Sequence, residues 1–360
     1  MSHEIRKHQT VHQRLIRRYT LLDDESGPSL ANPGKSEDAA LESRGRRRSN
    51  GRRPVQGKIG FVGLGRMGAA MAANLAAVGR RVVPYVRRPD QTAKLVALGL
   101  KPTTDIADLF DCEVVISMLP DDDAVRDVVF GRPALGIEGL ASGLVSRAIH
   151  LSMSTISTAA ASQLAAEHAR RGQGYVAAPV FGNPDAAKAR QLFVVVAGMP
   201  ADVERCRPLI GNLGQQAFMV GTDPAAANLI KLLGNMMTAT TLEMLGEIIA
   251  LLRKRGLDPK VFVDILTNTM FGGRVHRIYG DRIVAQNYEP GFALPLALKD
   301  VRLALAEAEA EAVPMPSVSV VRDRLLSGII RGYGDLDWTA LGLIAAEEAS
   351  VGEVPPVRIP

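Results

Sequence analysis

The sequence predicts an α/β protein, with a doubly wound sheet in the N-terminal part and an all-α domain in the C-terminal part. Two patterns favour this fold. Short apolar, β-rich runs alternate with helical stretches over residues 58–220, which is typical of a parallel sheet covered by helices on both faces. After Gly221 the strand-like runs stop and helical periods fill the chain. We therefore expect a sheet domain over 58–220, a helical domain over 221–350 and a tail at 351–360.

The composition is that of an ordinary globular protein. Of the 360 residues, 47% are apolar and 22% are charged, and neither the 34 glycines nor the 21 prolines are periodic. This excludes collagen, a coiled coil and wholesale disorder. The only cysteines are Cys112 and Cys206. A chain of this length buries a sufficient core without disulfide bonds, so a disulfide scaffold is excluded too.

The positive charge of the chain comes from its N-terminal segment. Residues 1–58 carry 13 Lys/Arg and 7 Asp/Glu, whereas residues 59–360 carry 30 and 31. We interpret residues 1–57 as a disordered basic arm or an over-long start. Its Arg-rich run at 44–54 leaves a nucleic-acid-binding arm open, and a transit peptide is a second alternative, against which the acidic residues argue. Nucleic acid is not an expected partner, because the folded part is nearly neutral.

Seven strands are expected in the sheet domain. They lie at residues 58–62, 81–86, 113–118, 148–153, 174–177, 193–197 and 217–220. Pro84 interrupts the second run, and proline cannot donate a backbone hydrogen bond to a neighbouring strand. The second strand is therefore expected to lie at an edge of the sheet or to end early.

A long helix is expected to open the helical domain. Asp223 is a suitable N-cap residue, Pro224 suits the first helical position, and Gly256 can end the helix. Such a helix is roughly 45 Å long. Four more helices are expected, at residues 259–268, 273–286, 296–312 and 317–332.

The apolar part of this long helix, residues 229–252, is not expected to span a membrane. Lys231, Glu243 and Glu247 interrupt it, well short of the stretch of about 18 uncharged residues that a span needs. We expect a buried helix, no membrane partner and a cytoplasmic protein.

A glycine-rich turn follows the first expected strand. The segment GLGRMG places Gly63, Gly65 and Gly68 in a G-x-G-x-x-G array between a strand and a helix, as in Rossmann-type dinucleotide-binding domains. These glycines allow, in order, the tight turn, the approach of the backbone to a pyrophosphate and close helix–strand packing. The free N–H groups at the helix N-terminus favour phosphates. The expected cofactor contacts in this turn are Gly63, Leu64, Gly65, Arg66, Met67 and Gly68.

Arg87 and Arg88 predict the cofactor. They stand about 20 residues after the turn, where a site that prefers NAD normally carries an acidic residue for the ribose hydroxyls. Two guanidinium groups can instead bind the 2′-phosphate of NADP(H) through charge-assisted hydrogen bonds. We therefore expect NADP(H), with NAD(H) as the alternative cofactor; two merely solvated arginines are the structural alternative.

The end of the third expected strand is a further candidate cofactor contact. Ligands of doubly wound sheets bind beyond the carboxyl ends of the strands. Met118, Leu119 and Pro120 are therefore placed to cover the ribose or the nicotinamide. An ordinary strand followed by a helix capped at 121–123 is the alternative interpretation.

Five sequence blocks resemble the β-hydroxyacid dehydrogenases related to 3-hydroxyisobutyrate dehydrogenase, with 6-phosphogluconate dehydrogenase and the imine reductases as more distant relatives. The blocks are GFVGLGRMGAAMAANL at 60–75, LSMSTIS at 151–157, APVFGNPDAA at 178–187, AANLIKLLGN at 226–235 and LKDVRLAL at 298–305. The resemblance implies an NAD(P)-dependent enzyme that exchanges a hydride with a small β-hydroxy acid, semialdehyde or related carbonyl. It also implies a homodimer.

The resemblance further implies which residues carry the chemistry. Lys231 matches the lysine that exchanges a proton with the substrate oxygen, and Asn235 matches an asparagine one turn later on the same helix face. Ser154 and Thr155 match residues that face the substrate, and Lys299 matches a contact near the nicotinamide. The alternatives are a surface lysine at 231 and a simple helix-capping role for the two hydroxyl residues.

The sequence departs from the family around the expected substrate site. Ser152 and Thr158 stand where the family usually has Asp and Pro. Phe181 precedes Gly182 and Asn183, which replace a pair of glycines whose N–H groups approach the substrate carboxylate in relatives. We expect Gly182 and Asn183 to contact the substrate in a narrower, less polar pocket. The substrate is then either an acid other than hydroxyisobutyrate or not an acid.

Two other functions remain open. An imine reductase keeps the fold, although Lys231 argues against it because the imine reductases usually carry Asp or Tyr there. An inactive, cofactor-binding nucleic-acid adaptor would explain the basic arm but not the pair of Lys231 and Asn235. No metal is expected, because His150, His168 and His276 lack the spacing of metal ligands.

Overall fold

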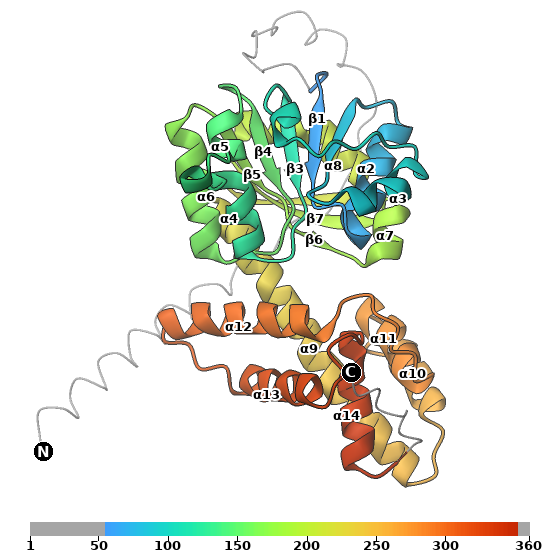
Figure 1. Cartoon of the computed structure of the whole chain (residues 1–360). Coiled ribbons are helices and arrows are strands. Elements are labelled where there is room, and N and C mark those ends of the chain that lie inside the picture. Colours follow the sequence, from blue (N-terminus) through green and yellow to red (C-terminus); the bar gives the residue numbers. More distant parts are fainter. Residues whose placement is uncertain (1–54, 352–360) are drawn as a thin grey trace, which may run out of the picture. The chain divides into compact units, whose positions relative to one another are not determined.

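The computed structural model describes residues 55–351 (Figure 1). The segments expected as a basic arm and a C-terminal tail lie almost wholly outside this range. Residues 59–221 contain all of the strands found in the described chain, and residues 224–348 are helical apart from their connections. This arrangement confirms the predicted fold class. A search of residues 55–351 found no helix long and apolar enough to cross a membrane.

The strands form one mixed sheet. They are β1 (Ile59–Val62), β2 (Val82–Tyr85), β3 (Val114–Ser117), β4 (Ile149–Ser152), β5 (Gly174–Ala177), β6 (Val180–Phe181), β7 (Leu192–Gly198) and β8 (Gly214–Gly221). From β2 through β1, β3 and β4 to β5, neighbouring strands are parallel. Strand β7 runs antiparallel to β5 and β6 and parallel to β8.

The prediction of a parallel sheet is therefore wrong at β7, which runs antiparallel to β5 and β6. The connection from β5 to β7 contains one helix, α7 (Pro184–Lys188). A helix of five residues is about 8 Å long, too short to carry the chain back along the sheet for a parallel crossover. All seven expected strands are present, and β2, which contains Pro84, lies at an edge as predicted. The two-residue strand β6 is too short to show an alternating pattern.

Helices cover both faces of the sheet, as the doubly wound prediction requires. They are α2 (Arg66–Ala77), α3 (Thr92–Val96), α4 (Asp122–Phe130), α5 (Leu140–Gly143), α6 (Thr158–Arg170) and α8 (Pro200–Leu213). Phe61 of β1 faces the apolar core beneath α2 and α8, whereas Val115 of β3 faces a second core beneath α4, α5 and α6. In Figure 1, α2 and α4 lie on opposite sides of the strands.

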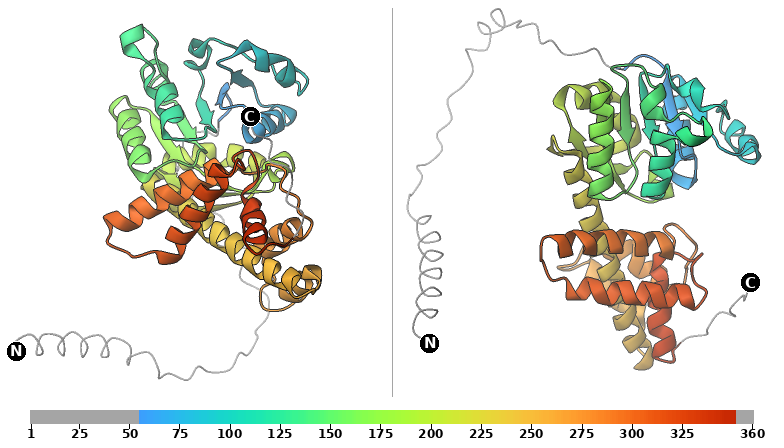
Figure 2. Two further views of the ribbon diagram at one scale, coloured as in Figure 1. Left: turned by 60° about the horizontal axis from the view of Figure 1, so that its bottom comes forward. Right: turned by 60° about the vertical axis from the view of Figure 1, so that its left-hand side comes forward.

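Helix α9 (Pro224–Lys254) connects the sheet to the other helices (Figure 2). Asp223 caps it by accepting a hydrogen bond from the Ala225 N–H at 3.0 Å, and Gly256 follows its end with a φ of 69°, so both predicted ends are confirmed. Ala227 belongs to a core of the sheet region, while Leu242 belongs to the core of the helical region. The later helices are α10 (Pro259–Thr267), α11 (Arg274–Val284), α12 (Leu294–Ala310), α13 (Pro316–Ile330) and α14 (Leu341–Glu348).

Helix α14 was not expected, because it has no polar face. Its residues from Leu341 to Ala346 are all buried, so no apolar period appears in the sequence. It packs closely against α9: a Cβ added to Gly246 would lie 2.7 Å from the Cα of Gly342. The two helix backbones approach so closely because both residues are glycine.

A chain of buried polar side chains links β3, β4 and α6. Gln173 donates from Nε2 to two backbone carbonyls, so its Oε1 accepts from Nδ1 of His168 at 2.7 Å. Nε2 of His168 then accepts from Nδ1 of His150 at 3.0 Å, and Nε2 of His150 accepts from the Ser117 hydroxyl at 2.8 Å. Both imidazoles are therefore neutral, each in a defined tautomer. Burial lowers the pKa of His168 to about 4, and burial followed by the neighbouring His168 lowers that of His150.

This histidine chain predicts a loss of stability in acid. An unfolded His168 takes up a proton near pH 6.5, whereas the folded one resists it until about pH 4, so the free energy of unfolding falls between these values. The contribution of His168 is about 3 kcal/mol across this window. Urea unfolding at pH 7, 6 and 5 should give a shallower decline for His168→Gln than for the wild type. His276 does not belong to this set of hydrogen-bonded side chains, so His276→Gln should show the same decline in unfolding free energy as the wild type. An equal decline in all three proteins would contradict the prediction.

Candidate active site

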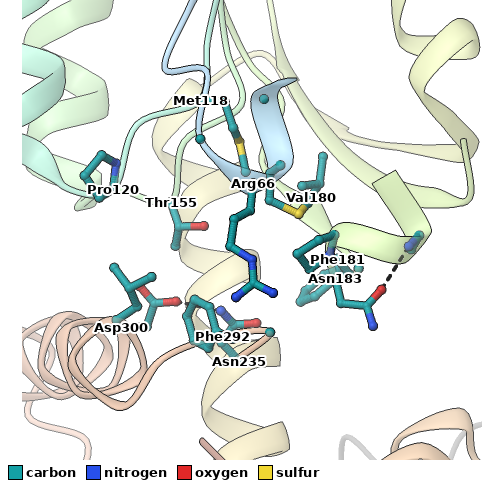
Figure 3. Close-up of a pocket in the computed structure, with 18 of the residues that line it drawn as sticks. Arg66, Met118, Pro120, Thr155, Val180, Phe181, Asn183, Asn235, Phe292 and Asp300 are labelled. Atoms are coloured by element: carbon teal, nitrogen blue, oxygen red, sulfur yellow. Dashed lines mark hydrogen bonds between the residues drawn. The ribbon is translucent and has the colours of Figure 1, made fainter. Parts of the chain in front are cut away.

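A large pocket brings together nearly all of the predicted site residues (Figure 3). It extends from the carboxyl ends of β1, β2 and β3 to α9, α11 and α12, and its volume is about 1310 Å³. This exceeds the roughly 300–1,000 Å³ of a pocket for one small ligand. The predicted residues in its lining are Gly63, Leu64, Gly65, Arg66, Met67, Gly68, Arg87, Arg88, Met118, Leu119, Pro120, Thr155, Gly182, Asn183, Lys231, Asn235 and Lys299. Ser154 is missing from this lining.

The glycine-rich turn has the geometry of a phosphate cradle. Gly63 has a φ of 86°, and a Cβ there would lie 2.2 Å from the Met118 carbonyl oxygen. A Cβ on Gly68 would lie 2.0 Å from the Gly63 carbonyl oxygen. At Gly65 a Cβ would meet nothing within 4 Å, and no side chain caps the first turn of α2. The turn therefore presents open space and free N–H groups, which fit a pyrophosphate.

Arg66 extends from this turn into the pocket (Figure 3). Its Nη1 donates a hydrogen bond to the carbonyl of Pro290, in the loop before α12. Buried Asp337 holds the same loop, because its Oδ2 accepts from the N–H groups of Gly291 and Phe292, both at 2.9 Å. Arg66 and this fixed loop thus form one of the contacts between the sheet and helical regions.

Arg87 and Arg88 follow β2 at the pocket rim, and both are exposed. Nε of Arg88 lies 3.9 Å from the Asp90 carboxylate, a pair that is largely open to solvent. Within residues 55–351, Arg87 has no hydrogen bond or ion pair, so its guanidinium is available to an anion.

Ser154 supports the pocket wall from behind. Its hydroxyl accepts from the Leu119 N–H at 2.8 Å and lies 3.5 Å from the Ser117 carbonyl, and its side chain is fully buried. The hydroxyl is thus engaged with the backbone at the tip of β3, and a contact of Ser154 with the substrate stays a prediction. Thr155 does line the pocket, and its carbonyl accepts from Nζ of Lys299 at 2.5 Å.

Lys231 begins a chain of buried polar groups. Its Nζ donates to Oδ1 of Asn235 at 2.7 Å, and Nδ2 of Asn235 donates to Oδ2 of Asp300 at 2.6 Å. Oδ1 of Asp300 lies 2.9 Å from Nζ of Lys299. Burial lowers the pKa of Lys231 from 10.5 to about 8; the Asp300 carboxylate opposes this shift and the Lys299 charge adds to it. Lys231 can thus gain and lose a proton near neutral pH.

Gly182 and Asn183 form another part of the wall. Gly182 has a φ of 139°, and a Cβ there would lie 2.6 Å from Cδ2 of Leu192. Oδ1 of Asn183 caps α7 by accepting from the Ala186 N–H at 2.9 Å (Figure 3). This bond fixes the amide, so its Nδ2 group is the part left to donate to a ligand.

Sequence reasoning missed two carboxylates that organise the site. Asp300 follows Lys299 directly in the block LKDVRLAL, and a charged pair next to the apolar run LPLAL could have indicated it. Asp337 has a local signal only as the N-cap of the 3₁₀ helix Trp338–Ala340, where its Oδ1 accepts from the Thr339 N–H at 3.2 Å. Its contact with the loop before α12 gave no such signal, because the N–H groups that its Oδ2 accepts from lie about 45 residues earlier. Among residues 55–351, no group of three or more His, Cys, Asp or Glu is arranged to hold a metal ion.

Two family models match the described regions. Residues 58–221 match the NAD-binding domain of 6-phosphogluconate dehydrogenase, and residues 225–343 match the NAD-binding domain of NADP-dependent 3-hydroxyisobutyrate dehydrogenase. A 3-hydroxyisobutyrate dehydrogenase of Pseudomonas aeruginosa is 32% identical over 256 residues, 69% of this chain and 84% of the relative. The chain belongs to the β-hydroxyacid dehydrogenase family. It is an NAD(P)-dependent oxidoreductase.

Two further relatives match most of this chain. An uncharacterized oxidoreductase of Bacillus subtilis, YfjR, is 39% identical over 286 residues, 79% of this chain and 98% of the relative. The 3-hydroxyisobutyrate dehydrogenase of Mycobacterium tuberculosis, solved with L-serine, has a TM-score of 0.70 at 25% identity and covers 81% of this chain and 99% of its own.

The cradle predicts different effects for two glycines. Gly65→Ala should leave the melting temperature unchanged, because its Cβ meets no protein atom, yet weaken NADPH binding by occupying the space before the turn. Gly68→Ala should lower the free energy of unfolding by about 1–3 kcal/mol, because its Cβ overlaps a backbone carbonyl. Thermal unfolding and fluorescence titration with NADPH measure both effects. Equal loss of stability in the two variants, or unchanged NADPH affinity in Gly65→Ala, would contradict the assignment.

Proposed function

We propose that this enzyme transfers a hydride between NADP(H) and a small β-hydroxy acid, the matching semialdehyde or a related carbonyl compound, with Lys231 as general acid and base. The observation that supports this most is the buried chain of Lys231, Asn235 and Asp300 beside the phosphate cradle. Relatives named 3-hydroxyisobutyrate dehydrogenase, one of them solved with L-serine, which is itself a β-hydroxy acid, favour this substrate class.

The glycine-rich turn and the two arginines after β2 are the proposed cofactor contacts. When bound, the nicotinamide supplies or accepts the hydride. Gly63, Gly65 and the first turn of α2 would hold the pyrophosphate, because this backbone is open and has free N–H groups. Arg87 and Arg88 would bind the 2′-phosphate of NADP(H).

Lys231 moves the proton in this proposal. In oxidation, its neutral amine takes the hydroxyl proton of the alcohol, while a hydride leaves the carbon that bears this hydroxyl. In reduction, its ammonium returns a proton to the carbonyl oxygen. Asn235 directs Nζ, and Asp300 holds Asn235, so both act as positioning residues. A pKa of about 8 keeps both forms of Lys231 populated near neutral pH.

The remaining substrate contacts come from polar groups that face the pocket. The hydroxyl of Thr155 and Nδ2 of Asn183 are donors for the substrate carboxylate or carbonyl oxygen. Lys299 adds positive charge nearby, although its hydrogen bond to the Thr155 carbonyl already orients it. These donors suit an anionic oxygen of the substrate.

Replacing Lys231 tests the proposal. Lys231→Met should lower turnover by roughly 10²–10⁴, the usual contribution of a positioned acid or base, with little change in NADPH affinity. In the wild type, alcohol oxidation should rise with pH up to about 8, because it needs the neutral amine. Carbonyl reduction should fall above about pH 8, because it needs the ammonium. Steady-state kinetics over pH 6–10 on small β-hydroxy acids, semialdehydes and cyclic imines measures these effects.

Lys254→Met is the matched control for this experiment. Lys254 lies at the far end of α9, where its Nζ donates to the Ala349 carbonyl, so its loss should leave turnover and the pH profile unchanged. Wild-type turnover in Lys231→Met would remove the catalytic assignment. Activity confined to imines would replace the proposed substrate class with that of an imine reductase.

The arginine pair tests the preference for NADP(H). Replacing Arg87 and Arg88 with Asp and Ser should weaken NADPH binding by roughly 10- to 100-fold, a value reduced by the exposure of both side chains, and leave NADH binding level or improved. Calorimetric titration with each nucleotide measures this. Arg81→Ser, at an exposed arginine outside the pocket, should change neither affinity. Equal wild-type affinity for NADH and NADPH would refute the preference.

We also propose that two copies assemble along α9. Ile230, Met237, Met244 and Leu251 recur every seven residues, the spacing of a coiled-coil seam, and are exposed by 41%, 69%, 57% and 63%. A second copy would remove this apolar stripe from water. The mass of the protein in solution tests whether it is a dimer.

A cytoplasmic location stays a prediction.

A further inference from the structure

Two aromatic side chains form one wall of the pocket. Phe181 of β6 and Phe193 of β7 stand directly opposite each other in an antiparallel pair, and both line the pocket. Residues in such a pair project from the same face of the sheet and lie within reach of each other. We call these two residues the aromatic wall.

The aromatic wall begins beside Nζ of Lys231, the atom that is proposed to carry the proton. Nζ of Lys231 lies 4.3 Å from the centre of the Phe181 ring. Gly234, one turn further along α9, makes room for the same ring: a Cβ there would lie 2.4 Å from Cζ of Phe181. The ring is therefore held against α9 between these two residues, and it presents an apolar surface beside the reacting oxygen.

The wall continues away from Lys231 toward the rim of the pocket. The guanidinium of Arg274, at the start of α11, lies 5.8 Å from the centre of the Phe193 ring. Met237 and Thr238 of α9 also line the pocket. The two rings therefore each have a cation beside them, Lys231 at Phe181 and Arg274 at Phe193, and all four side chains belong to one pocket lining.

We propose that the substrate carries an apolar group about the size of a phenyl ring on the carbon next to the reacting one, and that this group binds against the aromatic wall. This inference rests on the proposed function and names its substrate class. A bulky apolar group gains free energy by leaving water for this surface, and aromatic rings gain further from offset or edge-to-face contact. A small hydrated substrate would leave both rings in contact with water.

A pair of alcohols that differ only in this group tests the inference. 3-Hydroxypropanoate and 2-benzyl-3-hydroxypropanoate share the reacting CH₂OH and the carboxylate, and in both the alcohol is oxidised to the aldehyde as NADP⁺ is reduced. The wild type should favour the benzyl compound in kcat/KM by about tenfold or more, the discrimination that an apolar pocket provides for added apolar atoms. Calorimetric titration with 2-benzylpropanoate, which lacks the hydroxyl, should show the same preference over propanoate without turnover.

Variants of the wall decide whether these rings cause the preference. Phe181→Ser and Phe193→Ser should each reduce the ratio of the two kcat/KM values at least fivefold, whereas Phe181→Leu, which keeps an apolar side chain, should retain most of it. Phe218→Ser is the matched control: Phe218 contacts Phe193 from β8 at 6.4 Å between ring centres but lies outside the pocket lining, so its loss should leave the ratio unchanged.

Each outcome decides one question. Equal use of the two alcohols by the wild type would overturn the inference and leave the proposed function standing. So would a Phe193→Ser variant that alters the mass of the protein in solution but not the ratio, because the wall would then contact a second copy. Turnover of neither alcohol by protein that binds NADPH would overturn the proposed function and this inference with it.

Discussion

The architecture of the pocket depends on the burial of one ammonium group. Lys231 is 7% exposed on a largely apolar helix, and an isolated charge in that position is costly. The carboxylate of Asp300, on α12, offsets this cost, because it is linked to Lys231 through the side chain of Asn235. The residue beside that carboxylate, Lys299, binds the backbone of Thr155 in the sheet region. The positions of α9, α12 and the loop after β4 are therefore linked through one buried cation.

The two ends of the pocket are built from different parts of the chain. At the phosphate end the contacts are backbone, and the surroundings of Gly63 and Gly68 show why no side chain fits there. At the Lys231 end the contacts are side chains brought from β6, β7, α9 and α12. The first kind of site tolerates little change in sequence, because a Cβ at Gly63 or Gly68 meets a carbonyl oxygen. The second can change its ligand by exchanging single side chains such as Phe181.

This difference explains how much of the site could be predicted. The glycine-rich turn and the ends of α9 follow from local rules of backbone geometry and capping, and Asp223 and Gly256 could be assigned from the sequence alone. The bonds of Asp337 to the loop before α12 and the burial of Ser154 depend on contacts between distant segments, which no local pattern contains. Strand β6 and helix α14 were missed for related reasons, since the first is too short for a period and the second is apolar on every side.

The close contact of Gly246 with Gly342 has a mechanical consequence. Helix α9 is a stiff rod, and the 15 residues from Lys231 to Gly246 span about 22 Å of it. Contact between bare backbones leaves no side chain to absorb a displacement. A larger side chain at either glycine would therefore push α9 away from α14 and tilt its axis. Because the helix is stiff, this tilt would also move Lys231. The orientation of the ammonium is thus tied to a pair of residues that touch no ligand.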